Sequence, residues 1–440
     1  METPVDHITE KTACTDRAII WILAAMAFTL PFGAWQDHMP MGITFAQMAI
    51  PLACLTFLIS FAKDIRKKIY YHPSWLFYAG FLVLTLPTIY MSGKASIIYA
   101  LLLTGYAALT FCAHNAANRY ADILLIIKGF ALGFATVLIL SCLSYFKIFD
   151  LGELFGQPIV LEAYGVYRLL GTELNPNAFA VYFITGLPAA GALIMAEKSK
   201  LVKTGWIIFT ILCLLGICVT FSRSAILGAF FGLASLWFLQ GQINWRRSVI
   251  FVILIPICVI SAFKLPALVI NHSSAIQMQE TNIKFRYRMI EDKEDAIGIR
   301  LEFLPVAIDI IKNHPLTGIK YGELETILKP YAVRQESPHN IFLDIAIYFG
   351  IPALFFFCGF LTWALLASFF ATLKIENKED RIVSALLLSI TMGNLINGVF
   401  HSSHYSSLFW LIIALMFATM HLAAKDKNFS LASLLPPSKK

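Results

Sequence analysis

Apolar runs of about 20 residues recur along almost the whole chain, and a helix of that length spans a bilayer. Charged residues make up only 14% of the sequence, whereas soluble domains carry about 25%. Because a water-exposed surface needs more charge, the sequence predicts a polytopic membrane protein. We expect about twelve transmembrane helices, near residues 17–33, 41–62, 74–91, 96–113, 123–146, 177–196, 204–221, 224–240, 248–263, 341–370, 383–400 and 406–424.

The predicted fold is an all-α integral membrane protein with one large extramembrane insertion. Residues 1–263 hold helices 1–9, residues 264–340 form a loop or lobe, and residues 341–440 hold helices 10–12 and a tail. The first apolar run has no cleavage site after it, so we expect a retained span rather than a signal peptide.

The lobe is expected to contain a helix over residues 297–312, where apolar residues recur at helical spacing. His314-Pro315 is a stop signal for this helix. Pro305 inside the run predicts a kink or a late start.

Lysine and arginine gather in one set of connections between the runs, while the alternate short connections are nearly bare. Cytoplasmic loops carry this excess, so both termini are predicted to be cytoplasmic and the lobe is predicted to lie on the outer face of the membrane. The basic connections include Lys63, Arg66, Lys67, Lys68, Lys198, Lys200, Lys203, Arg246, Arg247, Lys374, Lys378, Arg381, Lys425, Lys427, Lys439 and Lys440.

Other classes of function are disfavoured by residue placement. The net charge of +7 sits between spans rather than on one face, so no nucleic-acid partner is expected. The cysteines show no disulfide or metal spacing. The acidic run Glu291–Asp295 is interpreted as a solvated charge cluster. We therefore expect neither a metal ion nor a cofactor.

Three residues on the predicted outer face have side chains suited to chemistry on a phosphate ester. Arg223 stands between two apolar runs with almost no loop, where an arginine is costly unless it is paired or hydrated. Arg300 begins the lobe helix. His339 is expected in the first turn of the helix that forms the tenth span, where the positive end of the helix dipole favours a neutral imidazole. Two guanidinium groups can hold a diphosphate, and the imidazole can serve as a general base.

Neighbouring polar residues are secondary candidates. Arg168, before the turn signal Asn175-Pro176, is expected to help hold a polar headgroup. Asn340 is expected to cap the tenth span or to contact substrate, with Ser337 as the alternative cap. Asn394 and Asn397 are interpreted as interhelical hydrogen bonders.

These motifs together resemble the O-antigen ligase and polymerase superfamily. The resemblance is carried by Thr220-Phe-Ser-Arg-Ser-Ala225, Gly298-Ile-Arg-Leu301, His314-Pro-Leu-Thr-Gly318, Ser337-Pro-His-Asn-Ile-Phe342 and Gly171-Thr-Glu-Leu-Asn-Pro-Asn177. It implies a GT-C-like membrane glycosyltransferase of the bacterial inner membrane that is independent of metal ions and has a periplasmic active site. The donor would be a glycan on undecaprenyl diphosphate, and the acceptor would be the lipid A-core oligosaccharide.

The resemblance also implies roles and alternatives. Arg223 and Arg300 match the family's essential arginines and would hold the diphosphate, and His339 would activate the acceptor hydroxyl. An O-antigen polymerase and a protein O-oligosaccharyltransferase remain alternatives within the superfamily, but the histidine and the short region after the last span favour the ligase. A membrane transporter is the alternative from another class, which the scarcity of mid-span charges disfavours.

Overall fold

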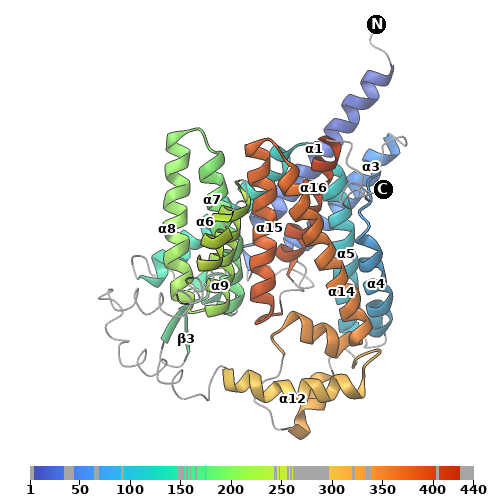
Figure 1. The fold of residues 1–440 in the computed structure, drawn as a ribbon, viewed down its shortest axis with the longest axis vertical. Coiled ribbons are helices and arrows are strands. Elements are labelled where there is room, and N and C mark those ends of the chain that lie inside the picture. Colours follow the sequence, from blue (N-terminus) through green and yellow to red (C-terminus); the bar gives the residue numbers. More distant parts are fainter. Residues whose placement is uncertain are drawn as a thin grey trace.

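Helices account for most of the protein in the computed structural model, and they form a bundle with a smaller helical lobe at one end (Figure 1). The structure describes residues 4–33, 44–63, 69–90, 94–146, 148, 153–154, 157–158, 160–163, 166–173, 175–241, 245–246, 248–254, 257, 260, 297–319, 323–331, 338–402 and 406–426.

The bundle helices are α1 (Pro4–Thr29), α3 (Phe45–Lys63), α4 (Trp75–Tyr90), α5 (Lys94–Ala116), α6 (Tyr120–Tyr145), α7 (Pro176–Ala196), α8 (Lys200–Thr220), α9 (Arg223–Leu239), α14 (Ile341–Lys374), α15 (Lys378–Gly398) and α16 (Ser407–Asp426). Within the described residues, six of them (α6, α7, α8, α14, α15 and α16) are long and apolar enough to cross a membrane, and α3, α4 and α9 contain shorter apolar helices. The protein is therefore a multi-pass membrane protein by helix length and composition. The count of twelve spans stays a prediction, since the range 248–263 lies only partly in the described residues.

The bundle is apolar inside and, on several helices, outside. Aromatic rings fill the core between α4, α5, α14 and α16, where Tyr106 stacks on Trp410 at 5.6 Å between ring centroids. On α3, by contrast, Leu52, Leu55 and Leu58 are exposed. An exposed face of large aliphatic side chains is typical of a surface that meets lipid.

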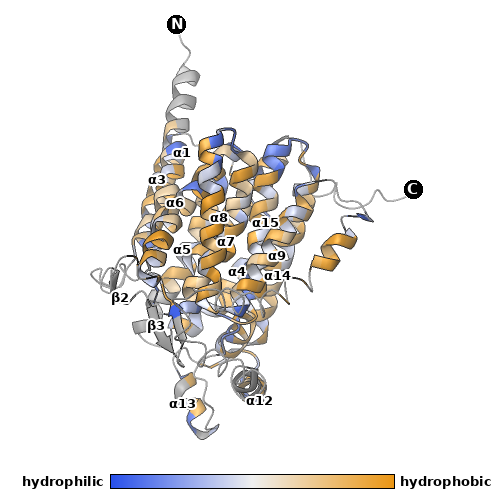
Figure 2. Cartoon of the chain, turned by 90° about the vertical axis from the view of Figure 1, so that its left-hand side faces the viewer, coloured by the Kyte–Doolittle hydropathy of each residue, from blue (hydrophilic) through white to orange (hydrophobic). Residues whose placement is uncertain are grey.

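Hydrophilic residues line the helix turns at one end of the bundle (Figure 2). The α5–α6, α7–α8 and α14–α15 turns at this end carry basic residues, and it is here called the basic end. Lys198 approaches Glu379 at 3.6 Å, which joins the α7–α8 turn to the start of α15. Lys425, near the end of α16, donates to Asn118 at 3.3 Å in the α5–α6 turn. The charge pattern of the sequence thus corresponds to one face of the folded protein.

The opposite end, here called the lobe end, comprises the α8–α9 turn, the start of α14, the end of α15 and the small elements beside them. Two short antiparallel hairpins precede α7: β1 (Glu153–Leu154) with β2 (Gln157–Pro158), and β3 (Val160–Ala163) with β4 (Val166–Leu169). The expectation of a purely helical chain missed them because each strand is only two or four residues long.

The lobe consists of α12 (Ile297–Asn313), α13 (Leu324–Leu328) and the 3₁₀ helix η3 (Lys329–Tyr331), and α12 lies across the end of the bundle (Figure 1). Helix α12 has the predicted bounds to within one residue and continues through Pro305, so the alternative of a late start was wrong. Phe303, Ala307 and Ile310 pack in a small core of their own with Ile347 of α14.

Candidate functional site

Arg223 begins α9 immediately after a very tight reversal of the chain. Helix α8 ends at Thr220, Phe221 adopts the left-handed conformation with φ of 55°, and Ser222 is the N-cap of α9. This single left-handed residue explains why the two apolar runs have almost no loop between them. Arg223 therefore stands at a helix N-terminus, where the N–H groups of the first turn and the helix dipole favour an anion beside the guanidinium group.

Arg168 lies next to this reversal and joins three elements. It follows the hairpin turn on β4, is only 8% exposed, and donates from Nε to the carbonyl oxygen of Thr220 at 2.9 Å. Its Nη2 donates to Oδ1 of Asn177 at 3.0 Å. The guanidinium group thus connects the end of α8 with the start of α7. This geometry gives Arg168 a bracing position beside Arg223, where the sequence had predicted a headgroup contact.

Each residue of the Asn175-Pro176-Asn177 segment has a structural role in this arrangement. Asn175 is the N-cap of α7 and accepts from the backbone N–H of Asn177 at 2.8 Å. Pro176 takes the first helical position, where a missing N–H costs nothing. Asn177 then holds Arg168. The turn predicted from sequence is confirmed, and its third residue has a long-range partner.

His339 precedes α14 and differs from its expected place by one position. The sequence analysis put it in the first helical turn, but Asn340 is the N-cap and His339 comes before it. Asn340 accepts from the N–H groups of Phe342 and Leu343 at 2.9 and 3.0 Å, as its predicted capping role requires. Ser337, the other predicted cap, lies outside the described residues. His339 is exposed at the positive end of the helix.

Asn340 also ties α14 to α15. Its Nδ2 donates to the carbonyl oxygen of Val399 at 2.9 Å. The amide therefore contacts protein groups through both its oxygen and its nitrogen. These bonds fix the backbone next to His339, and they favour a supporting role over the predicted substrate contact.

Backbone strain marks the same two places. In the described part of the chain, the non-glycine residues with positive φ are Phe221 and His339, at 55° and 46°. Such conformations cost on the order of 1–3 kcal/mol and cluster at functional sites. One lies two residues before Arg223 and the other is His339 itself, so the strain coincides with two of the three residues predicted from sequence.

The packing of α9 on α15 brings these two places to one end of the bundle. The helices are antiparallel and approach closely at glycines, since a Cβ on Gly228 would lie 2.6 Å from the carbonyl oxygen of Gly393. Arg223 lies five residues before Gly228, and Gly398 lies five residues after Gly393. Arg223 is therefore level with the end of α15, where Asn340 binds Val399. The start of α9 and the start of α14 therefore both lie against the lobe end of α15.

The lobe helix is joined to α14 by two reciprocal backbone hydrogen bonds. The N–H of Ile319 donates to the carbonyl of Ile347, and the N–H of Ile351 donates to the carbonyl of Pro315, both at 2.8 Å. Gly318 and Gly350 have φ of 65° and 81°, and a Cβ on either would lie within 2.6 Å of backbone atoms of the other segment. This joint, residues 315–319 with 347–351, attaches the end of α12 to α14, beginning eight residues after His339.

Arg300 occupies the first turn of α12, and its backbone is in the helix as predicted. Its side chain lies outside the described part of the structure. About 20 Å of helix separates it from Asn313, at a rise of about 1.5 Å per residue. The joint therefore controls where the amino-terminal end of α12 lies across the bundle.

Asp344 is a residue that the sequence analysis overlooked. It lies in the first turn of α14, is almost fully buried, and its N–H donates to the carbonyl of Asn340. An acidic residue inside an apolar run is costly and is by default a functional candidate. That signal was present in the sequence five residues after His339.

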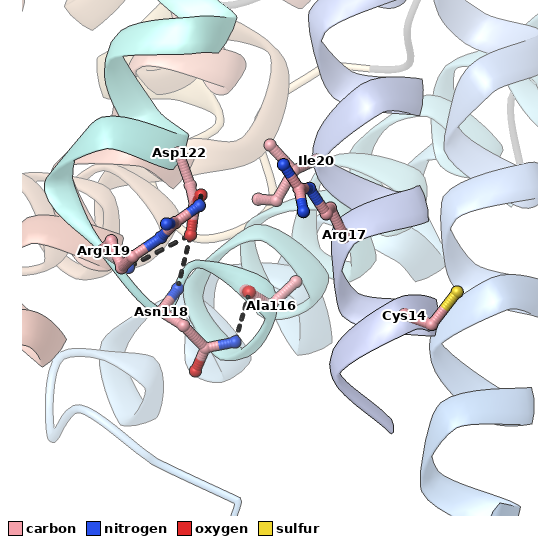
Figure 3. Close-up of a pocket in the computed structure, with 7 residues that line it drawn as sticks. All are labelled: Cys14, Arg17, Ile20, Ala116, Asn118, Arg119 and Asp122. Carbon is pink, nitrogen blue, oxygen red and sulfur yellow. Dashed lines mark hydrogen bonds and ion pairs between the residues drawn. The ribbon is translucent and has the colours of Figure 1, made fainter. Parts of the chain in front are cut away.

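A pocket of about 420 Å³ lies elsewhere, at the basic end (Figure 3). There Arg119 pairs with Asp122 at 2.9 Å in the capping box of α6. None of the predicted site residues lines this pocket, so it is separate from the candidate site. Its lining residues are Cys14, Arg17, Ile20, Ala116, Asn118, Arg119 and Asp122.

Comparison with protein families gives a match over about a third of the chain. Residues 208–358 match the model of a family described as O-Antigen ligase. The matched segment begins in α8, includes Arg223, α12 and His339, and ends in α14. A search among curated proteins returned no match. The family match confirms the resemblance inferred from the motifs.

Proposed function

Starting from this family relationship, we propose that the protein is a membrane glycosyltransferase of the O-antigen ligase and polymerase superfamily that acts as the ligase. It transfers a glycan from undecaprenyl diphosphate to the lipid A-core oligosaccharide at the periplasmic face of the inner membrane. In this proposal both termini are cytoplasmic, the fold is GT-C-like, and the lobe over residues 264–340 covers the site.

The observation that carries the proposal is that the starts of α9 and α14 both lie against the lobe end of α15. Arg223 supplies a guanidinium group at one helix N-terminus, and His339 supplies an imidazole before the other. A diphosphate needs positive charge and N–H donors, and an acceptor hydroxyl needs a base. The two residues proposed to meet these requirements, Arg223 and His339, are over a hundred positions apart in the sequence.

The proposed reaction uses each of these groups once. The acceptor hydroxyl oxygen attacks the anomeric carbon of the donor glycan, and its proton passes to His339. The bond from that carbon to the phosphate oxygen breaks, and undecaprenyl diphosphate leaves with the bonding electrons. Arg223 and Arg300 stabilise the charge that develops on the diphosphate. Because the arginines supply this charge, we propose that the reaction is independent of metal ions.

Arg168 and Asn340 have supporting roles in this proposal. Arg168 holds the α8–α9 reversal against α7 through Thr220 and Asn177. Asn340 holds the backbone of His339 against α15. Both act on the reaction through the positions of Arg223 and His339.

The test is a transfer assay with purified protein, undecaprenyl-diphosphate-linked glycan and rough lipopolysaccharide. A product of higher mass on the lipid A-core, unaffected by EDTA, is the expected result. Arg300→Ala should lower the rate by about 100-fold or more, the usual effect of losing one preorganised donor. Lys312→Ala is the matched control, because it removes an exposed cation from the last turn of the same helix.

Other outcomes separate the alternatives. A lengthened lipid-linked glycan with unchanged lipopolysaccharide identifies a polymerase, and glycan on an added protein acceptor identifies a protein O-oligosaccharyltransferase. Glycan movement across a proteoliposome membrane without any transfer identifies a transporter. Inhibition by EDTA that a divalent cation reverses would contradict the metal-independent mechanism.

A further inference from the structure

Asn397, at the lobe end of α15, differs from its neighbour Asn394 in its amide nitrogen, which lacks an acceptor, whereas in Asn394 it is the Oδ1 atom that lacks a donor among the described residues. Each residue is about 1% exposed. Nδ2 of Asn394 donates to the carbonyl oxygen of Ile390 on its own helix at 3.0 Å. Nδ2 of Asn397 has no acceptor within hydrogen-bond distance among the described residues. Neither amide nitrogen therefore makes the expected interhelical hydrogen bond within the described residues.

The helix periodicity places Asn397 opposite the start of α9. Residues four apart share a helix face, so Ser389, Gly393 and Asn397 form one stripe on α15. Along this stripe, Ser389 faces Gly232 and Gly393 faces Gly228. The next level pairs Asn397 with Ser224, the residue after Arg223. Asn394 is one residue further round the helix from Gly393 and is not part of this stripe.

A second polar group at this level is also buried. Ser222 is the N-cap of α9, but its hydroxyl makes no capping hydrogen bond. The side chain is 2% exposed, and its Oγ has no partner among the described residues. Buried polar groups are nearly always hydrogen-bonded, so each exception calls for an explanation. Two such exceptions flank Arg223, one on each helix.

We propose that Asn397 is a further donor-binding residue, whose amide N–H group donates to an oxygen of the diphosphate held by Arg223. An amide nitrogen can only donate, so its partner must be an acceptor oxygen. The positive end of α9 selects an anionic acceptor at this position. The hydroxyl of Ser222 can donate to the same group. This inference rests on the proposed function, and it names the part of the substrate that this end of α15 contacts.

The test compares the donor KM in the transfer assay for the wild type, Asn397→Leu, Asn397→Asp and Asn394→Leu. Asn397→Leu removes the donor, and Asn397→Asp keeps the shape but offers a carboxylate to the phosphate. Both should raise the donor KM about 10- to 100-fold, the range for one hydrogen bond to a charged group, and leave the acceptor KM unchanged. Asn394→Leu should leave the donor KM unchanged.

Binding of undecaprenyl diphosphate to the purified variants gives a second readout that needs no turnover. Weaker binding to both Asn397 variants and normal binding to Asn394→Leu would support the inference. Normal binding to either Asn397 variant, or equal weakening by Asn394→Leu, would overturn it while leaving the proposed function intact. A wild type that neither binds undecaprenyl diphosphate nor transfers glycan would overturn the proposed function, and this inference with it.

Discussion

At the scale of single residues, His339 is held in a left-handed backbone conformation that is unfavourable for a histidine. Its φ of 46° places Cβ close to the following carbonyl oxygen, which costs roughly 1–2 kcal/mol for an L-residue. The two hydrogen bonds that cap α14 through Asn340, and the bond from Asn340 to Val399, hold the backbone in place. The strained turn leaves the imidazole exposed before the helix, at the lobe end.

Replacing His339 by glycine should therefore lower the transfer activity without lowering the stability of the protein. Glycine adopts positive φ without penalty, so the melting temperature of the purified protein should stay the same or rise. Transfer should fall about 100-fold or more, because a general base contributes that much. Binding of undecaprenyl diphosphate should remain. A glycine variant with full transfer activity, or one that no longer binds the diphosphate, would contradict the role of His339 as the base.

The sequence predicted which residue types matter but not what they contact. Arg223 and His339 were recognisable because a cation and an imidazole stood beside apolar runs. Arg168 was recognisable too, but its partner Thr220 is 52 residues away and only the fold brings them together. The capping role of Asn340 is local and was predictable. Its bond to Val399, 59 residues away, was not.

At the scale of elements, the joint between the lobe and α14 depends on two glycines. A Cβ on Gly350 would lie 2.5 Å from the carbonyl oxygen of Leu316, and one on Gly318 would lie 2.4 Å from the carbonyl carbon of Tyr348. Both residues also have positive φ. The two segments can approach this closely only without side chains at these positions. The joint links the helix that carries Arg300 to the helix that follows His339.

Gly350→Ala should separate these helices and lower both stability and transfer. The clash is with backbone, which cannot rotate away, so we expect a loss of about 1–3 kcal/mol in the free energy of unfolding. Gly205→Ala is the matched control, since a Cβ there meets nothing within 4 Å on exposed α8 and should be neutral or slightly stabilising. Unchanged activity in Gly350→Ala would show that the joint does not position the lobe.

Local signals explain which elements were predictable. The end of α12 was predicted because its stop signal, His314-Pro315, directly follows the helix in the sequence. The kink at Gly350 was missed because residues 341–370 form one continuous apolar run, and a contact with the distant residue Leu316 decides the conformation there. The hairpins β1–β2 and β3–β4 were missed because strands of two to four residues give no periodic pattern.

At the scale of the whole molecule, the two ends of the bundle are chemically different. Lys198 with Glu379 and Lys425 with Asn118 are exposed contacts. Such surface pairs contribute little to stability, but they show that sequence-distant basic turns share one face. The predicted site residues lie at the other end. Under the positive-inside rule, the basic end would be the cytoplasmic one, which agrees with the proposal that the chemistry is periplasmic.

The orientation itself can be tested with a native cysteine. Cys14 is exposed on the first half of α1, at the basic end, where it lines the same pocket as Asn118 and Arg119. A membrane-impermeant maleimide should therefore fail to label it in intact spheroplasts and should label it after the membrane is permeabilised. Leu316→Cys places a thiol at a lobe-end position that is 71% exposed, and it should be labelled in intact spheroplasts. Cys14→Ser measures the background from the other cysteines.

Labelling of Cys14 in intact spheroplasts, with Leu316→Cys protected, would place the lobe in the cytoplasm. A glycan donor on the periplasmic side could then not reach Arg223 and His339, and the ligase proposal would fail for a reason independent of any transfer assay.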